Sequence, residues 1–181
     1  MKKLLYVAMI FLLFSCATSS ESIQKSSAHY KLGVSYLSEN NVQMAFVEFQ
    51  KAFELNPDNK DVLNAIGIIY LLNFEDYPKA VDFFQRAVKI DHDFSDAHNN
   101  LGFAYERSKM PDKAIESYRK ALSNLQYITP EKAFYNIGRV NYRLKKYDEA
   151  IEAHKDALKR RPDFYPAYYG LSLCYNAKGS Y

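Results

Sequence analysis

This sequence has few cysteines and a small net charge, and each of these features excludes a class of protein. The 181 residues include two cysteines, Cys16 and Cys174, so no framework of several disulfides can stabilise the fold. The formal net charge is only +3, from 24 basic and 21 acidic side chains. Because nucleic-acid binders carry a marked basic excess, we expect no nucleic-acid partner.

Long hydrophobic runs are also missing. The longest apolar run covers residues 4–14 and follows Lys2 and Lys3. It is too short for a helix that crosses about 30 Å of hydrocarbon, whereas its length and positive flank are typical of a signal peptide. We therefore predict that residues 1–15 are a signal peptide that is removed from the mature protein.

A short motif ends this run. The sequence Leu13-Phe14-Ser15-Cys16 resembles the bacterial lipobox, in which a small residue precedes an invariant cysteine that becomes the lipidated N-terminus. The resemblance implies a lipid anchor at Cys16, and Ala17 in place of aspartate implies sorting to the outer membrane. Two or more acyl chains would hold the protein there stably. An ordinary secretory signal and an uncleaved anchor remain as alternatives.

A serine-rich segment follows Cys16. Residues 17–27 have no periodic apolar face. We therefore predict that residues 16–27 are a lipidated cysteine and a flexible tether, and that the folded domain covers residues 28–181.

Glycine is scarce too, yet four of the six glycines recur at a regular interval. Their spacing is 34, 35 and 36 residues, from Gly33 through Gly67 and Gly102 to Gly138. A period near 34 is typical of arrays of helix-turn-helix repeats. Two alanines follow each glycine, and between them lies a large side chain: Phe49, Phe84, Tyr118 or His154. We expect the small residues to bring two antiparallel helices close together. The remaining space would be filled by these rings and by Leu32, Ile66, Leu101 and Ile137.

This pattern resembles the tetratricopeptide repeat, and the resemblance covers nearly all of the chain after residue 26. It implies an all-α fold, a right-handed superhelical solenoid of four full repeats and one extra first helix. The repeats would lie at about residues 26–59, 60–94, 95–130 and 131–164, with a partial repeat at 165–181. One extra residue is expected in the inter-helix turn of the second repeat, at residues 71–77.

No arrangement typical of an enzyme is visible. The four histidines fall on scaffold positions of the repeats, and His92 and His98, with the aspartates between them, match no strong metal-site template. The sequence contains no nucleophile elbow, phosphate-binding loop or recognisable pair of catalytic carboxylates. We therefore expect no catalytic residue, metal, cofactor or small-molecule substrate.

The repeat family implies a peptide-binding groove instead. Its lining residues lie three before each glycine, one after it, and four or five after it. Carried over to this chain, the positions also include Leu37, Ser38, Leu71, Leu72, Glu106 and Arg107. Among all of them we predict ten groove residues: Tyr30, Val34, Asn64, Ile68, Asn99, Phe103, Tyr135, Arg139, Tyr142 and Arg143. Some apolar members, Ile68 among them, could instead complete the core. The aromatic members suit a partner surface, and Asn64 and Asn99 could pair with a peptide backbone. We expect the groove to hold an extended or helical segment of a protein partner.

The junction between the third and fourth predicted repeats departs from the ordinary pattern. It reads Tyr127-x-Thr129-Pro130-Glu131-x-Ala133-x-x-Asn136-x-Gly138, with Ala97-His98-Asn99-Asn100-Leu101-Gly102 upstream. Thr129 is placed to cap the next helix, with Pro130 at its first position. These residues are similar to the PilF/PilW/Tgl family of type IV pilus biogenesis lipoproteins. The resemblance implies a non-enzymatic pilotin, lipid-anchored on the periplasmic face of the outer membrane, that binds secretin subunits and promotes their assembly.

Two other roles remain open from the sequence. A general periplasmic repeat lipoprotein could act as an adaptor that docks cell-wall or envelope enzymes. Alternatively, the repeats could belong to a larger enzyme with a catalytic domain beyond residue 181.

Overall fold

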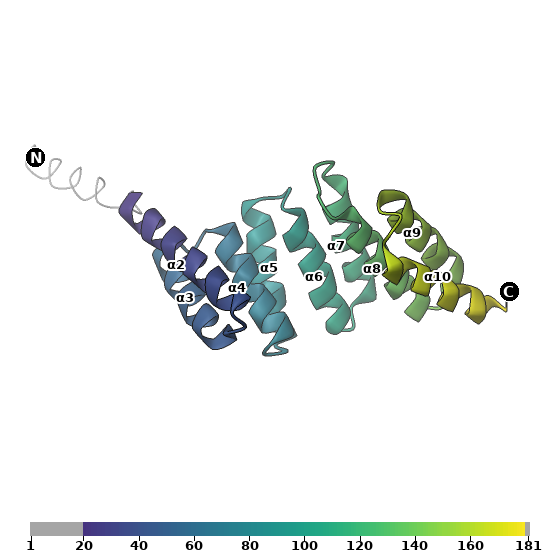
Figure 1. Cartoon of the computed structure of the whole chain (residues 1–181), viewed down its shortest axis with the longest axis horizontal. Coiled ribbons are helices and arrows are strands. Elements are labelled where there is room, and N and C mark those ends of the chain that lie inside the picture. Colours follow the sequence, from purple (N-terminus) through teal and green to yellow (C-terminus); the bar gives the residue numbers. More distant parts are fainter. Residues whose placement is uncertain (1–19, 180–181) are drawn as a thin grey trace, which may run out of the picture. The chain divides into compact units, whose positions relative to one another are not determined.

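The structure is a computed structural model that describes residues 20–179, and all regular structure in that range is helical. The helices are α2 (Ser20–Ser38), α3 (Val42–Leu55), α4 (Lys60–Leu72), α5 (Tyr77–Ile90), α6 (Ser95–Arg107), α7 (Pro111–Ser123), α8 (Pro130–Arg143), α9 (Tyr147–Arg160) and α10 (Tyr165–Lys178) (Figure 1). The prediction of an all-α fold with four helix pairs and one extra first helix is confirmed. None of these helices is both long and apolar enough to cross a bilayer. The predicted signal peptide and Cys16 lie outside the described residues.

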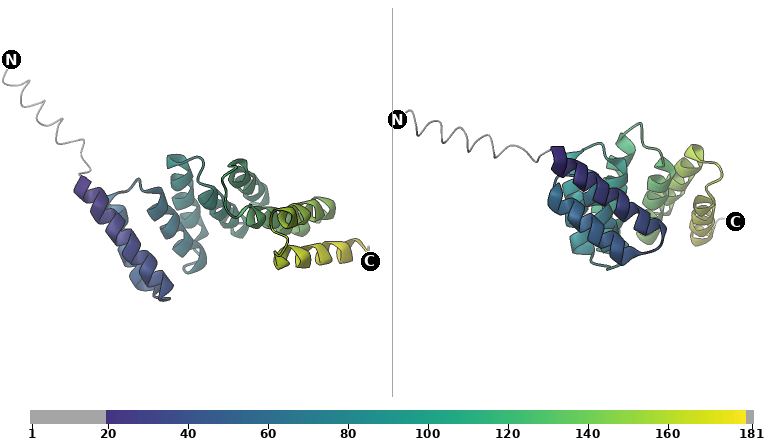
Figure 2. Two further views of the ribbon diagram at one scale, coloured as in Figure 1. Left: turned by 45° about the horizontal axis from the view of Figure 1, so that its top comes forward. Right: turned by 60° about the vertical axis from the view of Figure 1, so that its left-hand side comes forward.

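The chain divides into two compact units, Met1–Ile66 and Gly67–Tyr181, with the division inside α4. In the first unit, α2 packs against α3. In the second unit, helices that are neighbours in sequence pack side by side from α5 to α9, and α10 contacts both α9 and α8 (Figure 2). Helix α8, which carries four of the candidate binding residues, therefore contacts the preceding helix pair as well as α9 and α10.

Each repeat glycine lies against a ring of the following helix, as the pattern of small residues predicts. A Cβ atom added at Gly33 would lie 2.5 Å from Phe49 Cε1, and one at Gly102 would lie 2.6 Å from the Tyr118 ring. Phe49 and Tyr118 are fully buried, and so are the alanines on either side of them. The missing side chain at each glycine thus allows the close approach of the two helices.

The start of α2 differs from the sequence prediction of a flexible tether up to residue 27. Helix α2 already begins at Ser20. The Ser26 hydroxyl is fully buried and donates a hydrogen bond to the carbonyl of Ala52 at 2.7 Å, while Ser22 donates to the carbonyl of Leu55 at 2.6 Å. The serines therefore attach this segment to the C-terminal end of α3, where helix carbonyls need partners.

The large residues one position before the glycines do not all behave as predicted. Ile66, Leu101 and Ile137 are buried, whereas Leu32 is 43% exposed. The prediction that Leu32 fills the space between two helices is therefore wrong, because almost half of its side chain is accessible in the described structure.

The turn inside each helix pair uses the same backbone conformation. One residue per turn has a positive φ: 59° at Asn40, 52° at Glu75, 59° at Lys109 and 60° at Lys145. The next residue then bonds back to the first helix, as the Lys146 N–H does to the carbonyl of Asn141 at 2.9 Å. Because Glu75 comes one position later after its glycine than the others do, the extra residue of the second repeat lies in this turn, as predicted.

Helix α8 begins at the junction between the third and fourth repeats, but without the predicted cap. Pro130 occupies the first turn, whereas the Thr129 side chain makes no capping hydrogen bond. The capping role predicted for Thr129 is wrong. The Lys132 N–H, which a capping hydroxyl would accept from, donates instead to the backbone carbonyl of Thr129 at 3.1 Å.

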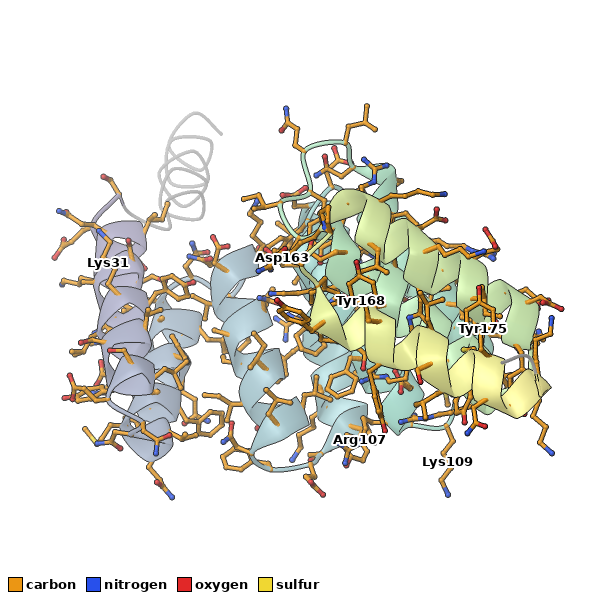
Figure 3. All side chains as sticks on the ribbon, turned by 45° about the vertical axis from the view of Figure 1, so that its right-hand side comes forward. Lys31, Arg107, Lys109, Asp163, Tyr168 and Tyr175 are labelled. Carbon is orange, nitrogen blue, oxygen red and sulfur yellow. The ribbon has the colours of Figure 1, made fainter. Side chains whose placement is uncertain are left out.

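Helix α10 is the extra first helix after the fourth pair. Ala167, Gly170 and Cys174 are buried, whereas Tyr168 and Tyr175 are 51% and 38% exposed. Figure 3 shows Tyr168 and Tyr175 along one side of α10. Helix α10 therefore has a face packed on α9 and a face that remains at the surface of the described structure.

Candidate functional site

The second unit brings together five of the ten residues predicted for the groove. Phe103 lies on α6, and the other four share α8, where a spacing of four residues places side chains on one helix face. These four, with one residue of α9 and three of α10, line a pocket of about 240 Å³: Tyr135, Arg139, Tyr142, Arg143, His154, Tyr169, Gly170 and Leu173. The pocket is therefore built by the fourth helix pair and α10.

The other five predicted residues lie elsewhere. Tyr30, Val34 and Asn64 belong to the first unit. Ile68 is partly buried against the core of the second unit, which makes it a packing residue, the alternative that the sequence left open. The side-chain carbonyl of Asn99 accepts a hydrogen bond from the Asn136 amide at 3.1 Å, so that acceptor is already engaged within the protein.

Two arginines of the pocket share one buried carboxylate. Arg139 Nη2 lies 2.8 Å from Glu106 Oε2, and Arg143 Nη1 lies 2.5 Å from Glu106 Oε1. The Glu106 side chain is 5% exposed, and it also accepts a hydrogen bond from the Tyr118 hydroxyl at 3.1 Å. Burial and, secondarily, the charge of Glu106 raise the pKa of Tyr118 far above its ordinary value. Because a buried carboxylate is unfavourable unless paired, these contacts fix the arginines of α8 against α6.

Arg139 is also held by aromatic rings. Its guanidinium carbon lies 5.3 Å from the centroid of Phe103 and 5.8 Å from that of Tyr135, within the range of cation–π attraction. Burial opposes the charge of Arg139, but the hydrogen bond and charge of Glu106 outweigh it and raise the pKa. Arg139 is therefore a charged side chain with a fixed orientation, whereas Arg143 is 61% exposed.

An imidazole lies beneath the pocket. His154 is 1% exposed, and its ring lies between Gly138 of α8 and Gly170 of α10. The Tyr135 ring centroid is 5.5 Å away. Burial lowers the pKa of His154 to about 4, so the ring is neutral at neutral pH. Its Nδ1 atom is buried without a hydrogen-bond partner in the described part of the chain. His154 thus fills the slot that Phe49 fills in the first repeat.

The sequence did not predict the shared carboxylate. Glu106 lies at a groove position, four residues after Gly102, but the pattern gave no reason to pair it with the arginines of the next repeat. The available signal was opposite charge at groove positions of adjacent repeats. Gly170 was not predicted as a contact of His154 either, although it follows Gly138 by nearly one repeat length.

Comparison with protein families supports the repeat assignment. Residues 26–59 and 93–163 match models described as tetratricopeptide repeat, and residues 75–109 match a model described as TPR repeat. These segments contain three of the four contacts between a repeat glycine and a ring, at Gly33, Gly102 and Gly138, whereas Gly67 lies between two matched segments.

The relatives include proteins of different kinds. Type IV pilus assembly protein PilF of Pseudomonas aeruginosa is 28% identical over 134 residues, which cover 73% of this chain and 52% of PilF. Anaphase-promoting complex subunit 3 of Schizosaccharomyces pombe is 31% identical over 133 residues, which cover 72% of this chain and 19% of that protein. The chain thus spans about half the length of the first relative and about a fifth of the second.

A solved structure agrees with the sequence comparison. The structure described as PilW, a widely conserved type IV pilus biogenesis factor, superposes with a TM-score of 0.79 at 25% identity, covering 86% of this chain and 70% of that chain. With its repeated pairs of antiparallel helices, the chain belongs to the tetratricopeptide-repeat proteins, and type IV pilus proteins are among its relatives.

Proposed function

We propose that this protein is a non-enzymatic scaffold of type IV pilus biogenesis that binds a protein partner at the pocket formed by α8, α9 and α10. The similarity to PilF over 73% of the chain carries the link to pili. The pocket supports partner binding, because tyrosine and arginine dominate its lining and are enriched where protein interfaces bind most strongly.

The side chains around the pocket suit binding rather than a chemical reaction. Arg139 and Arg143 are engaged with Glu106, and His154 is buried and neutral. A catalytic nucleophile needs a base within hydrogen-bond reach. The eight residues that line the pocket provide no serine, threonine or cysteine for that role.

The more specific role that we propose is that of a pilotin. Such a protein would be anchored through Cys16 in the outer membrane, face the periplasm, and bind secretin subunits while they assemble. The motif at residues 13–16 supports the anchor, since a cysteine with two or more acyl chains remains in a membrane. The junction at residues 127–138 supports the pilus family.

A second candidate is a general periplasmic adaptor that docks cell-wall or envelope enzymes. The match to anaphase-promoting complex subunit 3 favours keeping this alternative, because repeats of the same kind also occur in a protein that is not named for pili. In that role the same pocket would bind a different partner.

Deletion of the gene separates the two candidates. For a pilotin, heat-stable secretin multimers should disappear from membrane fractions on immunoblots and return when the gene is restored. Persistence of the multimers together with a cell-wall defect would reject the pilotin role and support the adaptor. Restoration with Cys16→Ala should fail, because the anchor is lost. The control is Ser172→Ala, at an exposed position of α10, which leaves the motif and the buried core intact.

A further inference from the structure

The pocket between α8, α9 and α10 has room for a side chain of a partner. Its volume is about 240 Å³, and three tyrosines and Leu173 supply most of its walls. Since a water molecule takes about 30 Å³ of liquid, a large apolar or aromatic side chain would displace several waters on entry. Displacing poorly held water from an apolar wall favours binding.

Positive charge lies at the edge of this apolar pocket. Arg139 and Arg143 both line it, whereas no aspartate or glutamate does. Glu106 neutralises only one of the two positive charges, and it is itself buried behind them. A guanidinium has several N–H donors, so the hydrogen bond that Arg143 gives to Glu106 leaves donors for a ligand.

The charged edge is also ordered before any partner binds. Glu106 holds both arginines, and the rings of Phe103 and Tyr135 flank Arg139. An ordered arginine loses little side-chain entropy when it binds, and its planar fork suits a carboxylate. The arrangement therefore favours an anionic group beside the apolar pocket over a cationic one.

We propose that this pocket binds a peptide segment in which a large apolar or aromatic side chain enters the cavity and a neighbouring carboxylate pairs with Arg143 and Arg139. This inference rests on the proposed function, because it names the chemical class of the partner segment. The carboxylate belongs to an aspartate or glutamate side chain within the segment.

An array of immobilised peptides tests the proposal with the purified full chain. The central pairs would be Phe-Asp, Phe-Asn, Phe-Lys and Ala-Asp in one common flanking sequence, with amidated C-termini. Phe-Asp should bind at least about tenfold more tightly than Phe-Asn, because a charge-assisted hydrogen bond is lost in Phe-Asn. Equal binding of Phe-Asp and Phe-Asn would overturn the proposal.

The variant Arg143→Gln should remove most of the preference for the carboxylate. Its side chain is 61% exposed, so the substitution leaves the packing of α8 in place, which thermal unfolding can verify. The matched control is Arg160→Gln, since Arg160 is exposed at the end of α9 and does not line the pocket. Raising the salt from about 50 to about 300 mM should weaken Phe-Asp binding in the wild type and much less in Arg143→Gln. An unchanged preference in Arg143→Gln would contradict the assignment.

Failure of this inference is distinguishable from failure of the proposed function. If the array shows no carboxylate preference while deletion still removes secretin multimers, the pilotin role stands and the partner chemistry is wrong. If the preference is present and the multimers persist, the pocket chemistry stands and the pilotin role is wrong.

Discussion

The first helices of the first and fourth repeats, α2 and α8, pack onto their partners in nearly the same way. The ring of Tyr30 lies 5.7 Å from that of Phe49 with planes tilted by 38°, and Tyr135 lies 5.5 Å from His154 with a tilt of 44°. Both pairs occupy equivalent repeat positions. The scaffold of a repeat therefore tolerates a change from phenylalanine to histidine at the partner position.

The surfaces of the same two helices differ. One residue after the glycine, α2 has Val34 and α8 has Arg139; four residues after it, α2 has Leu37 and α8 has Tyr142. Val34 and Leu37 are exposed apolar side chains, 44% and 36% accessible, whereas the two residues of α8 line a pocket. The contact between the helices is thus kept in both repeats, while the positions around it differ in charge and polarity.

The largest expected effect is a loss of folding stability in acid, which His154 of the fourth repeat should cause and Phe49 of the first repeat should not. The pKa of His154 is about 4 in the folded protein and 6.5 ordinarily, so the unfolded chain binds the proton first. Stability from the neutral imidazole is complete above pH 6.5 and is lost as the pH falls toward 4, by about 3 kcal/mol. Phe49, the equivalent residue of the first repeat, does not titrate.

Urea unfolding between about pH 7.5 and about pH 4.5 measures this loss in the wild type and in His154→Phe. The variant should lose clearly less stability over that range. His98, whose pKa is also lowered by burial, titrates in both proteins and cancels in the comparison. If the free energy of unfolding fell equally with pH in the two proteins, His154 would not be the group responsible.

The substitutions Gly138→Ala and Gly33→Ala should destabilise both repeats by similar amounts, about 2 kcal/mol each, because overpacking forces a shift of a buried ring. The added Cβ would lie 2.6 Å from His154 at Gly138 and 2.5 Å from Phe49 at Gly33. Chemical denaturation gives the free energies of unfolding. Ser172→Ala, at an exposed position of α10, is the control. An unchanged free energy of unfolding in either variant would show that the glycine is not in close contact with the ring.

The substitution Glu106→Gln should destabilise the protein by about 2 kcal/mol, because it leaves the largely buried Arg139 without its counter-charge. The equivalent residue of the first repeat is Leu37, which carries no such pair. Leu37→Gln should therefore change the stability by less than about 0.5 kcal/mol. Equal losses in the two variants, measured by denaturation at neutral pH, would argue against the ion pairs.

The smallest expected effect is a gain in stability. Lys145 has φ of 60°, a conformation that is strained for lysine and ordinary for glycine, so Lys145→Gly should stabilise the protein by about 0.5 to 1 kcal/mol. Asn40 occupies the equivalent turn of the first repeat at φ of 59°. Because asparagine tolerates this conformation better than lysine, Asn40→Gly should gain less. Thermal melting of the two variants decides, and a larger gain for Asn40→Gly would contradict the strain argument.

The helix pairs could be predicted from sequence because the signal is local and repeated. A glycine, two alanines and a large ring recur in each repeat, and each contact joins neighbouring helices at a fixed separation. The segment around Ser22 and Ser26 escaped prediction for the opposite reason. Its attachment to α3 depends on two hydroxyl groups. A serine-rich composition alone is typical of an unstructured segment.

The candidate site was predictable in part. The family positions placed Tyr135, Arg139 and Arg143 on the groove face, and the structure gathers them around one pocket. The role of Glu106 was not predictable, because its pairing depends on the side-chain conformations of two different repeats. Position within a repeat does not determine which charges meet across repeats.

In the proposed binding role, helix α10 links the affinity of the pocket to a packing contact just outside it. It supplies Tyr169, Gly170 and Leu173 to the pocket, while Cys174 holds it in the small cluster with Ala150 and Ile151. A ligand binds only the molecules in which this helix is seated, so the observed dissociation constant rises as the seated fraction falls. A bulky residue at Cys174 would therefore weaken partner capture without altering any atom that the partner touches.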